Sequence, residues 1–381
     1  MDPIIIIGTG LAGFSTAREL RKHDADTPLI LLSRDDGGYY YKPDISEALG
    51  KGNTPDDLIK KPAATVAEEL TADVRPHVEV QSIDAAAREM RLADQTLRYS
   101  KLVLANGAEP IRLPLAGDGA DDVFKVNNRT HYAAFRPAID RAERVAVLGA
   151  GLIGCEFSND LAAHGMRVDC IDPIDWPLQR FLPQACGVAV REGLSAAGVA
   201  WHLGRTVTAV QRNPAGGLRV ELDDATVLEV DAVLSAVGLR PATALAATAG
   251  LRINHGVVVD RHLQTSDPHI HALGDCAEVD GLFRPFVAPL MQAARALGRT
   301  LAGKPTAVRY PALPIIVKTP ACPTIVYPPV KQGGNWRIDG EAPDLEASCV
   351  ADDGRLTGFA LTGAATQQRG RYIKAAPPML G

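Results

Sequence analysis

The glycine pattern GxGxxG occurs twice in this chain of 381 residues, and each copy follows a short apolar run. The first copy spans residues 8–13 after the run at residues 4–7, and the second spans residues 149–154 after the run at residues 145–148. In a strand–turn–helix unit, the first glycine makes the tight turn. The second lets the backbone approach a pyrophosphate, and the third lets helix and strand pack closely. One such pattern is a weak signal, but two in this context predict two dinucleotides bound side by side.

The residues within each loop predict how the phosphates are held. A helix N-terminus offers N–H groups without intrahelical partners, and the helix dipole favours negative charge there. Two dinucleotides side by side predict a flavin enzyme that takes electrons from a nicotinamide. The expected contacts are Gly8, Thr9, Gly10, Leu11, Ala12 and Gly13 in the first loop, and Gly149, Gly151, Leu152, Ile153 and Gly154 in the second.

Length, charge and hydropathy narrow the class of protein. A chain of 381 residues exceeds the size of a single core, so two or three domains are expected. The net charge of −5 argues against a dedicated nucleic-acid binder. No apolar run approaches the roughly 18 residues that span a bilayer, and the first strand begins too early for a signal peptide. We therefore expect a cytoplasmic protein without a membrane segment.

Six cysteines are scattered along the chain, and none lies in a CxxC or CxxxxC pattern: Cys155, Cys170, Cys186, Cys276, Cys322 and Cys349. A disulfide framework is not expected in a large cytosolic chain. The spacing also predicts no redox dithiol and no zinc or iron–sulfur site, so no metal is expected. We interpret each cysteine as a small buried apolar residue. Electron chemistry would then depend on bound organic cofactors.

Hydrophobic periodicity predicts two β-α-β units and a different C-terminal region. The expected helices span about residues 11–22, 152–163, 184–196 and 287–302. Residues 44 to about 69 also read as helical, while residues 78–80 and 88–92 alternate like a small antiparallel meander. From Tyr310 the chain is proline-rich, with short strands and one weak helix near residues 364–371. We therefore expect a small third domain at the C-terminal end.

The order of five motifs resembles the pyridine nucleotide–disulfide oxidoreductase superfamily, which has the glutathione reductase fold. The motifs are GxGxxG at Gly8, LVLANGA at Leu102, GxGxxG at Gly149, VLSAVGLRP at Val233 and HALGDC at His271. The resemblance covers roughly residues 3–305, with Asn106 standing where the family usually has threonine. It implies an α/β protein with two Rossmann-like dinucleotide-binding domains, one for FAD and one for NAD, and a small C-terminal α+β domain.

By this resemblance the FAD-binding domain is discontinuous, because the NAD-binding domain is inserted within it. The expected bounds are residues 1–108 and 238–310 for the FAD-binding domain, 109–237 for the NAD-binding domain and 311–381 for the C-terminal domain. The C-terminal domain is too short to be the usual dimerisation domain of glutathione reductase. We therefore expect a monomer.

The stretch at residues 40–46, YYKPDIS, narrows the resemblance. Disulfide reductases carry a CxxxxC dithiol in about this place and peroxide-reducing relatives a single cysteine, but this chain has neither. It resembles the Y-x-K/R-P-x-L-S signature of reductases that serve rubredoxins and small ferredoxins. The C-terminal region resembles that of rubredoxin reductases from hydrocarbon-oxidising bacteria. The resemblance implies an NADH-dependent FAD flavoprotein that passes electrons singly from reduced flavin to rubredoxin.

Several residues are expected to surround the FAD. Ser33 ends the second strand, where an acid usually binds ribose, so we expect Ser33 to bind ribose and Arg34 to lie along the adenosine. Pro43 biases Lys42 towards an extended conformation, which would aim its cation at the flavin. A cation there would favour the reduced, anionic flavin.

Further FAD contacts follow from the resemblance. Asp275 after Gly274 should bind the ribityl chain, and the helix that begins near Val287 should point its positive end at the flavin. The remaining expected contacts of FAD are Val80, Ala105, Asn106 and Gly107.

The nicotinamide site has its own set of expected residues. Asp172 ends the strand after the second glycine loop, where a carboxylate accepts both ribose hydroxyls and repels a 2′-phosphate. We therefore predict NADH over NADPH, although Arg167 and Arg180 nearby could soften the preference. Glu156 matches a glutamate that lies near nicotinamide and flavin in relatives. Gly238 is also expected to contact NAD.

A basic stretch predicts where the electron acceptor docks. Residues 281–338 hold no Asp or Glu but contain Arg284, Arg295, Arg299, Lys304, Arg309, Lys318, Lys331 and Arg337. Rubredoxins and ferredoxins are typically acidic, so a basic surface would steer their encounter. Ordinary solvated helix charge is the alternative interpretation. Lys318, which closes an apolar strand, is expected either to reach the flavin or to lie at the surface.

No side-chain acid, base or nucleophile is required by this chemistry, so no catalytic residue is expected. Lys42, Glu156 and Lys318 are expected near the flavin or nicotinamide. Alternatives to rubredoxin reduction are the ferredoxin reductase component of an oxygenase system and an NADH oxidase. A non-enzymatic alternative is a flavin-bound interaction protein. The physiological pathway stays open.

Overall fold

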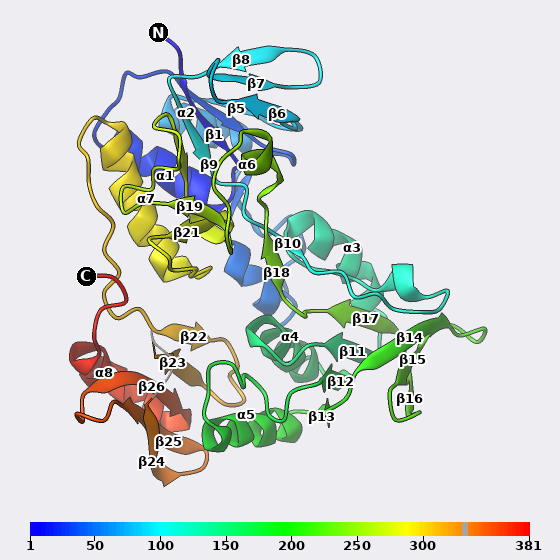
Figure 1. Ribbon diagram of the computed structural model, residues 1–381. Helices are drawn as coiled ribbons and strands as arrows, with labels where there is room; N and C mark the ends of the chain where they lie inside the picture. The colour runs from blue at the N-terminus through cyan, green and yellow to red at the C-terminus, as the bar shows by residue number, and fades with distance from the viewer. Residues whose placement is uncertain (330–333) are drawn as a thin grey trace.

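The two glycine loops follow the first strands of two separate parallel sheets (Figure 1). The computed structural model describes residues 1–329 and 334–381. Within these residues, the chain forms two units with parallel sheets and a C-terminal unit with an antiparallel sheet (Figure 1). This arrangement confirms the predicted α/β class with a small C-terminal α+β unit. The domain bounds stay a prediction.

The first parallel sheet is built around strand β1 (Ile4–Ile7), whose four isoleucines are all buried. Strands that are covered on both faces have continuous runs of apolar residues, and such a run predicted this strand from the sequence. The sheet order is β20-β9-β1-β2-β5. Its other strands are β2 (Leu29–Leu32), β5 (Asp73–Arg75), β9 (Lys101–Leu104) and β20 (Ile270–Ala272). Strands β9 and β20 are neighbours although the whole second unit lies between them in sequence.

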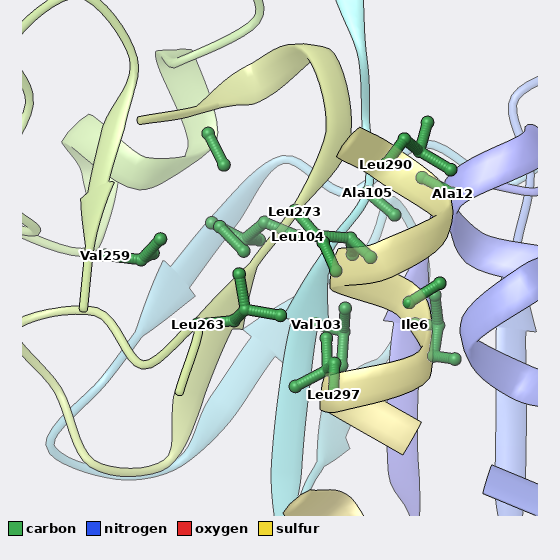
Figure 2. Close-up of a cluster of buried hydrophobic side chains, with 14 of the residues drawn as sticks. Ile6, Ala12, Val103, Leu104, Ala105, Val259, Leu263, Leu273, Leu290 and Leu297 are labelled. Atoms are coloured by element: carbon green, nitrogen blue, oxygen red, sulfur yellow. The ribbon is translucent and has the colours of Figure 1, made fainter. Parts of the chain in front are cut away.

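Helices α1 (Leu11–Arg21) and α7 (Val287–Leu301) pack against this sheet and against each other. Figure 2 shows Leu297 of α7 among the buried side chains of the sheet. A Cβ at Gly298 would lie 2.5 Å from the Cβ of Glu19, so the helices approach this closely only because residue 298 is glycine. At their other ends, Ala12 of α1 and Leu290 of α7 both approach Gly274, so the N-terminal ends of the two helices lie near each other beside the first glycine loop.

The predicted helix at residues 44–69 is wrong. The segment contains a short 3-10 helix, a strand and only one α-helix, because Gly52 has a positive φ of 67° and Pro55 cannot continue a helix. The elements are β3 (Tyr39–Tyr40), η1 (Lys42–Glu47), β4 (Ile59–Lys61) and α2 (Ala63–Leu70).

The predicted strand at residues 78–80 is also wrong, although a meander does follow it. The N–H of Val78 donates to the carbonyl of Ser33 at 2.7 Å, so this segment lies along the end of β2 instead. The meander consists of β6 (Ser82–Asp84), β7 (Glu89–Arg91) and β8 (Thr96–Arg98). The irregular path brings residues 78–80 beside the segment expected to hold adenosine.

The second parallel sheet has the order β13-β12-β11-β17. Its strands are β11 (Arg144–Leu148), β12 (Arg167–Asp172), β13 (Val199–Leu203) and β17 (Ala232–Ser235). Its helices are α3 (Arg129–Ile139), α4 (Leu152–Ala163) and α5 (Gln184–Ala196). An antiparallel meander of β14 (Val207–Arg212), β15 (Leu218–Leu222) and β16 (Val227–Val230) packs on this sheet through a shared apolar cluster.

The chain passes between the two parallel-sheet units twice, and the two passages are paired. Strand β10 (Ala108–Pro110) runs antiparallel to β18 (Leu239–Pro241), and Figure 1 shows them side by side between the units. Short elements complete the first unit and its connections: η2 (Ala120–Asp122), α6 (Ala244–Thr248), β19 (Val257–Val259), η3 (Gly274–Cys276) and β21 (Ala277–Val279).

The C-terminal sheet shares its apolar side chains with both other units. Its antiparallel order is β22-β23-β26-β25-β24. Val326 belongs to the apolar cluster that contains α5, whereas Ile325 belongs to the cluster that contains β1. Successive side chains of a strand point to opposite faces, so the sheet contributes one face to each cluster. Its elements are β22 (Ile315–Val317), β23 (Thr324–Tyr327), β24 (Asn335–Glu341), β25 (Asp344–Val350), β26 (Leu356–Thr362), η4 (Gly363–Gln368) and α8 (Arg369–Ala375).

Candidate functional site

The first glycine loop forms a cradle that is open on one side. Gly8 has a positive φ of 111°, and a Cβ there would lie 2.3 Å from the carbonyl oxygen of Ala105. A Cβ at Gly13 would lie 1.9 Å from the oxygen of Gly8, so α1 approaches β1 only without a side chain here. A Cβ at Gly10, by contrast, would have no atom within 4 Å. Glycine at position 10 therefore leaves room for a ligand.

Helix α1 begins at Leu11 beside this open space, and no side chain caps its first turn. The first N–H groups of a helix have no intrahelical partner and carry partial positive charge. Leu11 and Ala12 therefore offer N–H groups to an anion, and the loop fits a pyrophosphate. The Thr9 side chain points towards the end of β2, because its hydroxyl lies 2.5 Å from the hydroxyl of Ser33.

The second glycine loop repeats this geometry. A Cβ at Gly149 would lie 2.7 Å from the oxygen of Ala236, and one at Gly154 would lie 1.8 Å from the oxygen of Gly149. A Cβ at Gly151 would again have no atom within 4 Å, and α4 begins directly afterwards without a side-chain cap. Ile153 in the first turn is 44% exposed. The loop therefore also fits a pyrophosphate, with an apolar side chain beside it.

The end of β9 supplies a polar group that protein atoms leave unsatisfied. The side-chain Oδ1 of Asn106 is buried without a hydrogen-bond partner among the described residues. Its Nδ2 donates to the carbonyl of Ala242 at 2.7 Å, which fixes the direction of the amide. Gly107 follows with a positive φ of 72°. Buried polar atoms almost always have a hydrogen-bond partner, so this oxygen could accept a hydrogen bond from a bound cofactor.

Two hydrogen-bonded polar side chains, Ser33 and Asp35, follow β2 in the segment where an acid usually binds ribose. Ser33 is buried, and its hydroxyl donates to the carboxylate of Asp35 at 2.5 Å. Asp35 also accepts the N–H of Gly37 at 3.1 Å. Sequence reasoning missed Asp35, although an acid three residues after the strand in a Gly-rich turn was the available signal.

The predicted adenosine contacts lie close to this segment. The side chain of Arg34 is 61% exposed, with Glu79 and Glu109 each 4.0 Å from its Nη1. Val80 is buried at the end of the irregular segment that runs beside β2. Arg34 thus has no short ion pair and is available to a ligand.

The predicted ribityl and flavin contacts Asp275 and Lys42 face each other. The Lys42 Nζ lies 3.8 Å from the Asp275 Oδ2. Burial lowers the pKa of Lys42, while the charge of Asp275 opposes that shift. A Cβ at Gly274 would lie 3.1 Å from the Cβ of Ala12, which places Asp275 beside the start of α1. The pair therefore lies at the first glycine loop, and α7 begins at Val287 in the same region.

Glu156 collects contacts from two other parts of the chain. Its Oε2 accepts the hydroxyl of Ser46 at 2.6 Å and lies 3.0 Å from the Nζ of Lys318. Its Oε1 accepts the backbone N–H of Lys318 at 3.1 Å. Lys318 also donates to the carbonyl of Pro43. Lys318 is thus not a free surface residue. It binds η1, the segment that begins with Lys42.

A second carboxylate of α4, which sequence reasoning missed, binds the same segment. Asp160 accepts the N–H groups of Leu49 at 3.2 Å and Gly50 at 3.0 Å. Burial raises the pKa of Asp160 to about 6. No local pattern marks this residue, because its partners lie more than 100 residues away in the chain.

Asp172 lies where an acid was predicted, and it also organises the loop beside it. Its Oδ2 accepts the N–H of Ala150 at 2.6 Å, and its Oδ1 accepts the N–H of Ile174 at 3.1 Å. Gly238, which has a positive φ of 117°, directly precedes β18, the strand by which the chain returns to the first unit. Arg167 and Arg180 are exposed.

The six cysteines are all buried. Burial raises the pKa of Cys170, Cys186 and Cys276 to about 12, so these groups stay protonated near neutral pH. Across residues 1–329 and 334–381, no cluster of three or more His, Cys, Asp or Glu is arranged to bind a metal. No helix in the same ranges is long and apolar enough to cross a membrane.

Most cations of the basic stretch lie at the surface. Arg295, Arg299, Lys304, Arg309 and Arg337 are exposed, and Arg284 is half-buried. Within the described part of the chain, none of these six forms an ion pair within 4.0 Å; the carboxylate-bound member is Lys318. Lys331 lies outside the described residues.

Two family models match the chain. The model of the pyridine nucleotide-disulphide oxidoreductases covers residues 2–298, and that of the rubredoxin binding C-terminal domain covers residues 307–376. The chain is 46% identical to the rubredoxin-NAD(+) reductase of Alcanivorax borkumensis, with 100% of both chains covered. It is 40% identical to the rubredoxin-NAD(+) reductase of Acinetobacter baylyi, with 100% of this chain and 99% of that one covered.

A solved structure agrees with this assignment. The ferredoxin reductase for the CYP199A2 system of Rhodopseudomonas palustris superposes with a TM-score of 0.89 at 27% identity, covering 99% of this chain and 96% of that one. The resemblance drawn from the five sequence motifs is thereby confirmed. The chain belongs to the pyridine nucleotide-disulphide oxidoreductase family and, within it, to the group of the rubredoxin-NAD(+) reductases.

Proposed function

We propose that this chain oxidises NADH and passes the electrons singly, through FAD, to a rubredoxin. One observation carries the proposal: two open dinucleotide cradles are combined with a C-terminal unit that matches a rubredoxin binding domain. The segment at residues 40–46 supports it, because it contains no cysteine to form an intermediate dithiol. FAD supplies the chemistry, since it accepts a hydride and releases electrons one at a time.

The first cradle holds the FAD. The N–H groups of Leu11 and Ala12 bind its pyrophosphate, and Asn106 offers an unsatisfied carbonyl oxygen at the strand end. Arg34 lies along the adenosine, with Ser33 orienting Asp35 towards the ribose. The remaining FAD contacts are Gly8, Thr9, Gly10, Gly13, Lys42, Pro43, Val80, Ala105, Gly107, Glu156, Gly274, Asp275, Val287 and Lys318.

The second cradle holds the NADH. The N–H groups of Leu152 and Ile153 bind its pyrophosphate, while Asp172 accepts the ribose hydroxyls. A carboxylate there repels the 2′-phosphate of NADPH, so NADH is the preferred donor. The carboxylate is fixed for this task by the N–H groups of Ala150 and Ile174.

The acceptor docks on the basic surface formed by Arg284, Arg295, Arg299, Lys304, Arg309 and Arg337. These cations carry no close carboxylate partner, so their charge is available to an acidic protein such as a rubredoxin. Electrostatic attraction of this kind mainly raises the association rate. The protein acts as a monomer in this proposal.

The test is an anaerobic assay with two acceptors. A catalytic amount of the FAD-loaded protein is mixed with NADH and an excess of either rubredoxin or a plant-type ferredoxin, and acceptor bleaching is followed. Fast bleaching of rubredoxin with slow reduction of ferredoxin is the expected result. The reverse order would identify a ferredoxin reductase instead. Reduction of the flavin with neither acceptor bleached would indicate an NADH oxidase or another partner.

A further inference from the structure

Three parts of the chain that are distant in sequence meet at one buried carboxylate. Glu156 lies on α4 beside the second cradle, Ser46 lies on η1 beside the first cradle, and Lys318 follows β22 of the C-terminal unit. The side chain of Glu156 is only 6% exposed, and that of Lys318 is 23% exposed. The ion pair is therefore largely removed from water. Charges interact more strongly in such a buried environment than they do in water.

Each hydrogen-bonding group in this cluster is used. Glu156 accepts the Ser46 hydroxyl and both the ammonium and the backbone N–H of Lys318. The ammonium also lies 2.6 Å from the Ser46 hydroxyl and donates to the carbonyl of Pro43. Lys318 thus binds η1 and α4 at the same time. A lysine at the surface would not make these contacts.

Among residues 1–329 and 334–381, few other charges face Glu156. Glu47 of η1 lies 3.8 Å from the Lys318 ammonium and shares its charge. Cys155, the neighbour of Glu156 on α4, has its thiol pKa raised by burial and stays neutral. Asp160 lies one turn further along α4 and is bound by the N–H groups of Leu49 and Gly50. Lys318 is therefore the cation that compensates the charge of Glu156.

We propose that Lys318 is a positioning residue of the hydride-transfer site, supplied by the C-terminal unit. It pairs with Glu156 and, through Glu156, Ser46 and Pro43, fixes the segment that carries Lys42 against α4. The acceptor-binding unit thereby contributes to the geometry of the donor side. The inference rests on the proposed function, which places hydride transfer beside Glu156 and takes the C-terminal unit as the acceptor-binding unit.

Removing the cation has a consequence that depends on pH. A buried carboxylate without a cation pays a large desolvation cost when it ionises. In the Lys318→Met protein, Glu156 is expected to be protonated at low pH, where it still bonds to Ser46. At higher pH it must ionise without compensation, and the contact between η1 and α4 is expected to loosen.

The experiment compares four variants of the full-length, FAD-loaded protein from pH 6 to pH 8.5. They are Lys318→Met, Lys318→Arg, Glu156→Gln with Lys318→Met, and Lys374→Met, which removes an exposed cation on α8 of the same C-terminal unit. Two quantities are measured: the anaerobic rate of flavin reduction by NADH, and the thermal unfolding midpoint without NADH. Each is expressed relative to the wild-type value at the same pH.

For Lys318→Met, we expect the relative rate to fall about tenfold as the pH rises across this range, and the relative midpoint to fall with it. Lys318→Arg keeps a cation and should restore both quantities to near the wild-type pattern. The double variant removes both charges, so its relative values should not vary with pH. Lys374→Met should match the wild type throughout.

Two results would overturn the inference. One is a Lys318→Met protein whose relative rate and midpoint do not change with pH. The other is a pH dependence that persists in the double variant, because it could not then arise from Glu156. Neither measurement uses an acceptor, and the unfolding midpoint does not use NADH. A protein that fails to bleach rubredoxin would therefore refute the proposed function without deciding this inference.

Discussion

Asp160 and Gly50 lie so close that a Cβ on Gly50 would come within 2.4 Å of the Asp160 Oδ1. The carboxylate receives the N–H of Gly50 at 3.0 Å and that of Leu49 at 3.2 Å. A side chain at position 50 would therefore displace a carboxylate of the other unit. The contact attaches the turn after η1 to helix α4, and thus one cofactor cradle to the other.

This contact predicts a specific pH dependence of stability. Burial raises the pKa of Asp160 to about 6 in the folded protein, against 3.8 ordinarily. The folded state then binds the proton more tightly, so this group's contribution to stability falls as the pH rises from about 4 to 6. In Asp160→Asn nothing titrates. We expect the stability advantage of the wild type over this variant to fall by about 2 kcal/mol between pH 4 and pH 7.

Denaturant unfolding at each pH would measure this difference. Asp352→Asn, which changes an exposed carboxylate, is the matched control and should show no comparable slope. A difference between wild type and Asp160→Asn that is constant with pH would mean that the carboxylate does not titrate in this window.

The parts of the fold that follow from local chemistry were predictable. The glycine loops are fixed by backbone geometry at Gly8 and Gly149, and both were recognised from sequence. Helices α4 and α5 have the bounds that their apolar periodicity predicts. The helix predicted after Pro43 failed because glycine and proline at positions 52 and 55 interrupt an otherwise helical composition.

The parts of the site that depend on long-range contacts were not predictable. Glu156 and Lys318 were both expected near the cofactors, but nothing in the sequence indicates that they bind each other across 162 residues. Asp160 has no local pattern at all. Asp35 is different, because its turn sequence was visible and the usual position of the acid drew attention to Ser33 instead.

The two open glycines predict separable losses of cofactor. Gly151→Ala places a methyl group where a phosphate is expected, without touching protein atoms within 4 Å. We expect it to weaken NADH binding at least about tenfold while the FAD content is unchanged, because the two cradles are separate. Gly10→Ala should show the opposite pattern, with FAD lost.

Flavin absorbance of the purified protein and titration with NADH would measure both effects. Gly370→Ala is the control, since this glycine also has open space but lies on α8 of the C-terminal unit. If Gly10→Ala and Gly151→Ala impaired both cofactors equally, the assignment of one dinucleotide to each loop would be wrong.

Asp172 predicts how the donor preference responds to mutation. Asp172→Asn keeps an oxygen for the N–H of Ala150 but removes the negative charge that repels a 2′-phosphate. We expect the ratio of kcat/KM for NADH over NADPH to fall at least about tenfold. Asp172→Ala also removes both backbone contacts and should lower kcat/KM for NADH further.

Steady-state kinetics with a saturating artificial acceptor would separate this effect from acceptor docking. Asp175→Asn changes an exposed carboxylate of the same loop and serves as the control. An unchanged NADH to NADPH ratio in Asp172→Asn would show that another group sets the preference.

The proposed docking surface predicts a rate of acceptor reduction that depends on salt. Arg295 and Arg309 are exposed and have no carboxylate within 4.0 Å among the described residues, so reversing them to Glu changes the field without breaking an ion pair. We expect the bimolecular rate of rubredoxin reduction to fall about tenfold at low ionic strength in the double variant. The difference should shrink towards zero near 0.5 M salt, because the Debye length then falls to roughly 4 Å.

The Arg219→Glu control reverses an exposed arginine on β15, in the meander beside the second sheet. Equal rate losses in Arg219→Glu and the double variant would show that net charge, rather than this surface, governs the encounter.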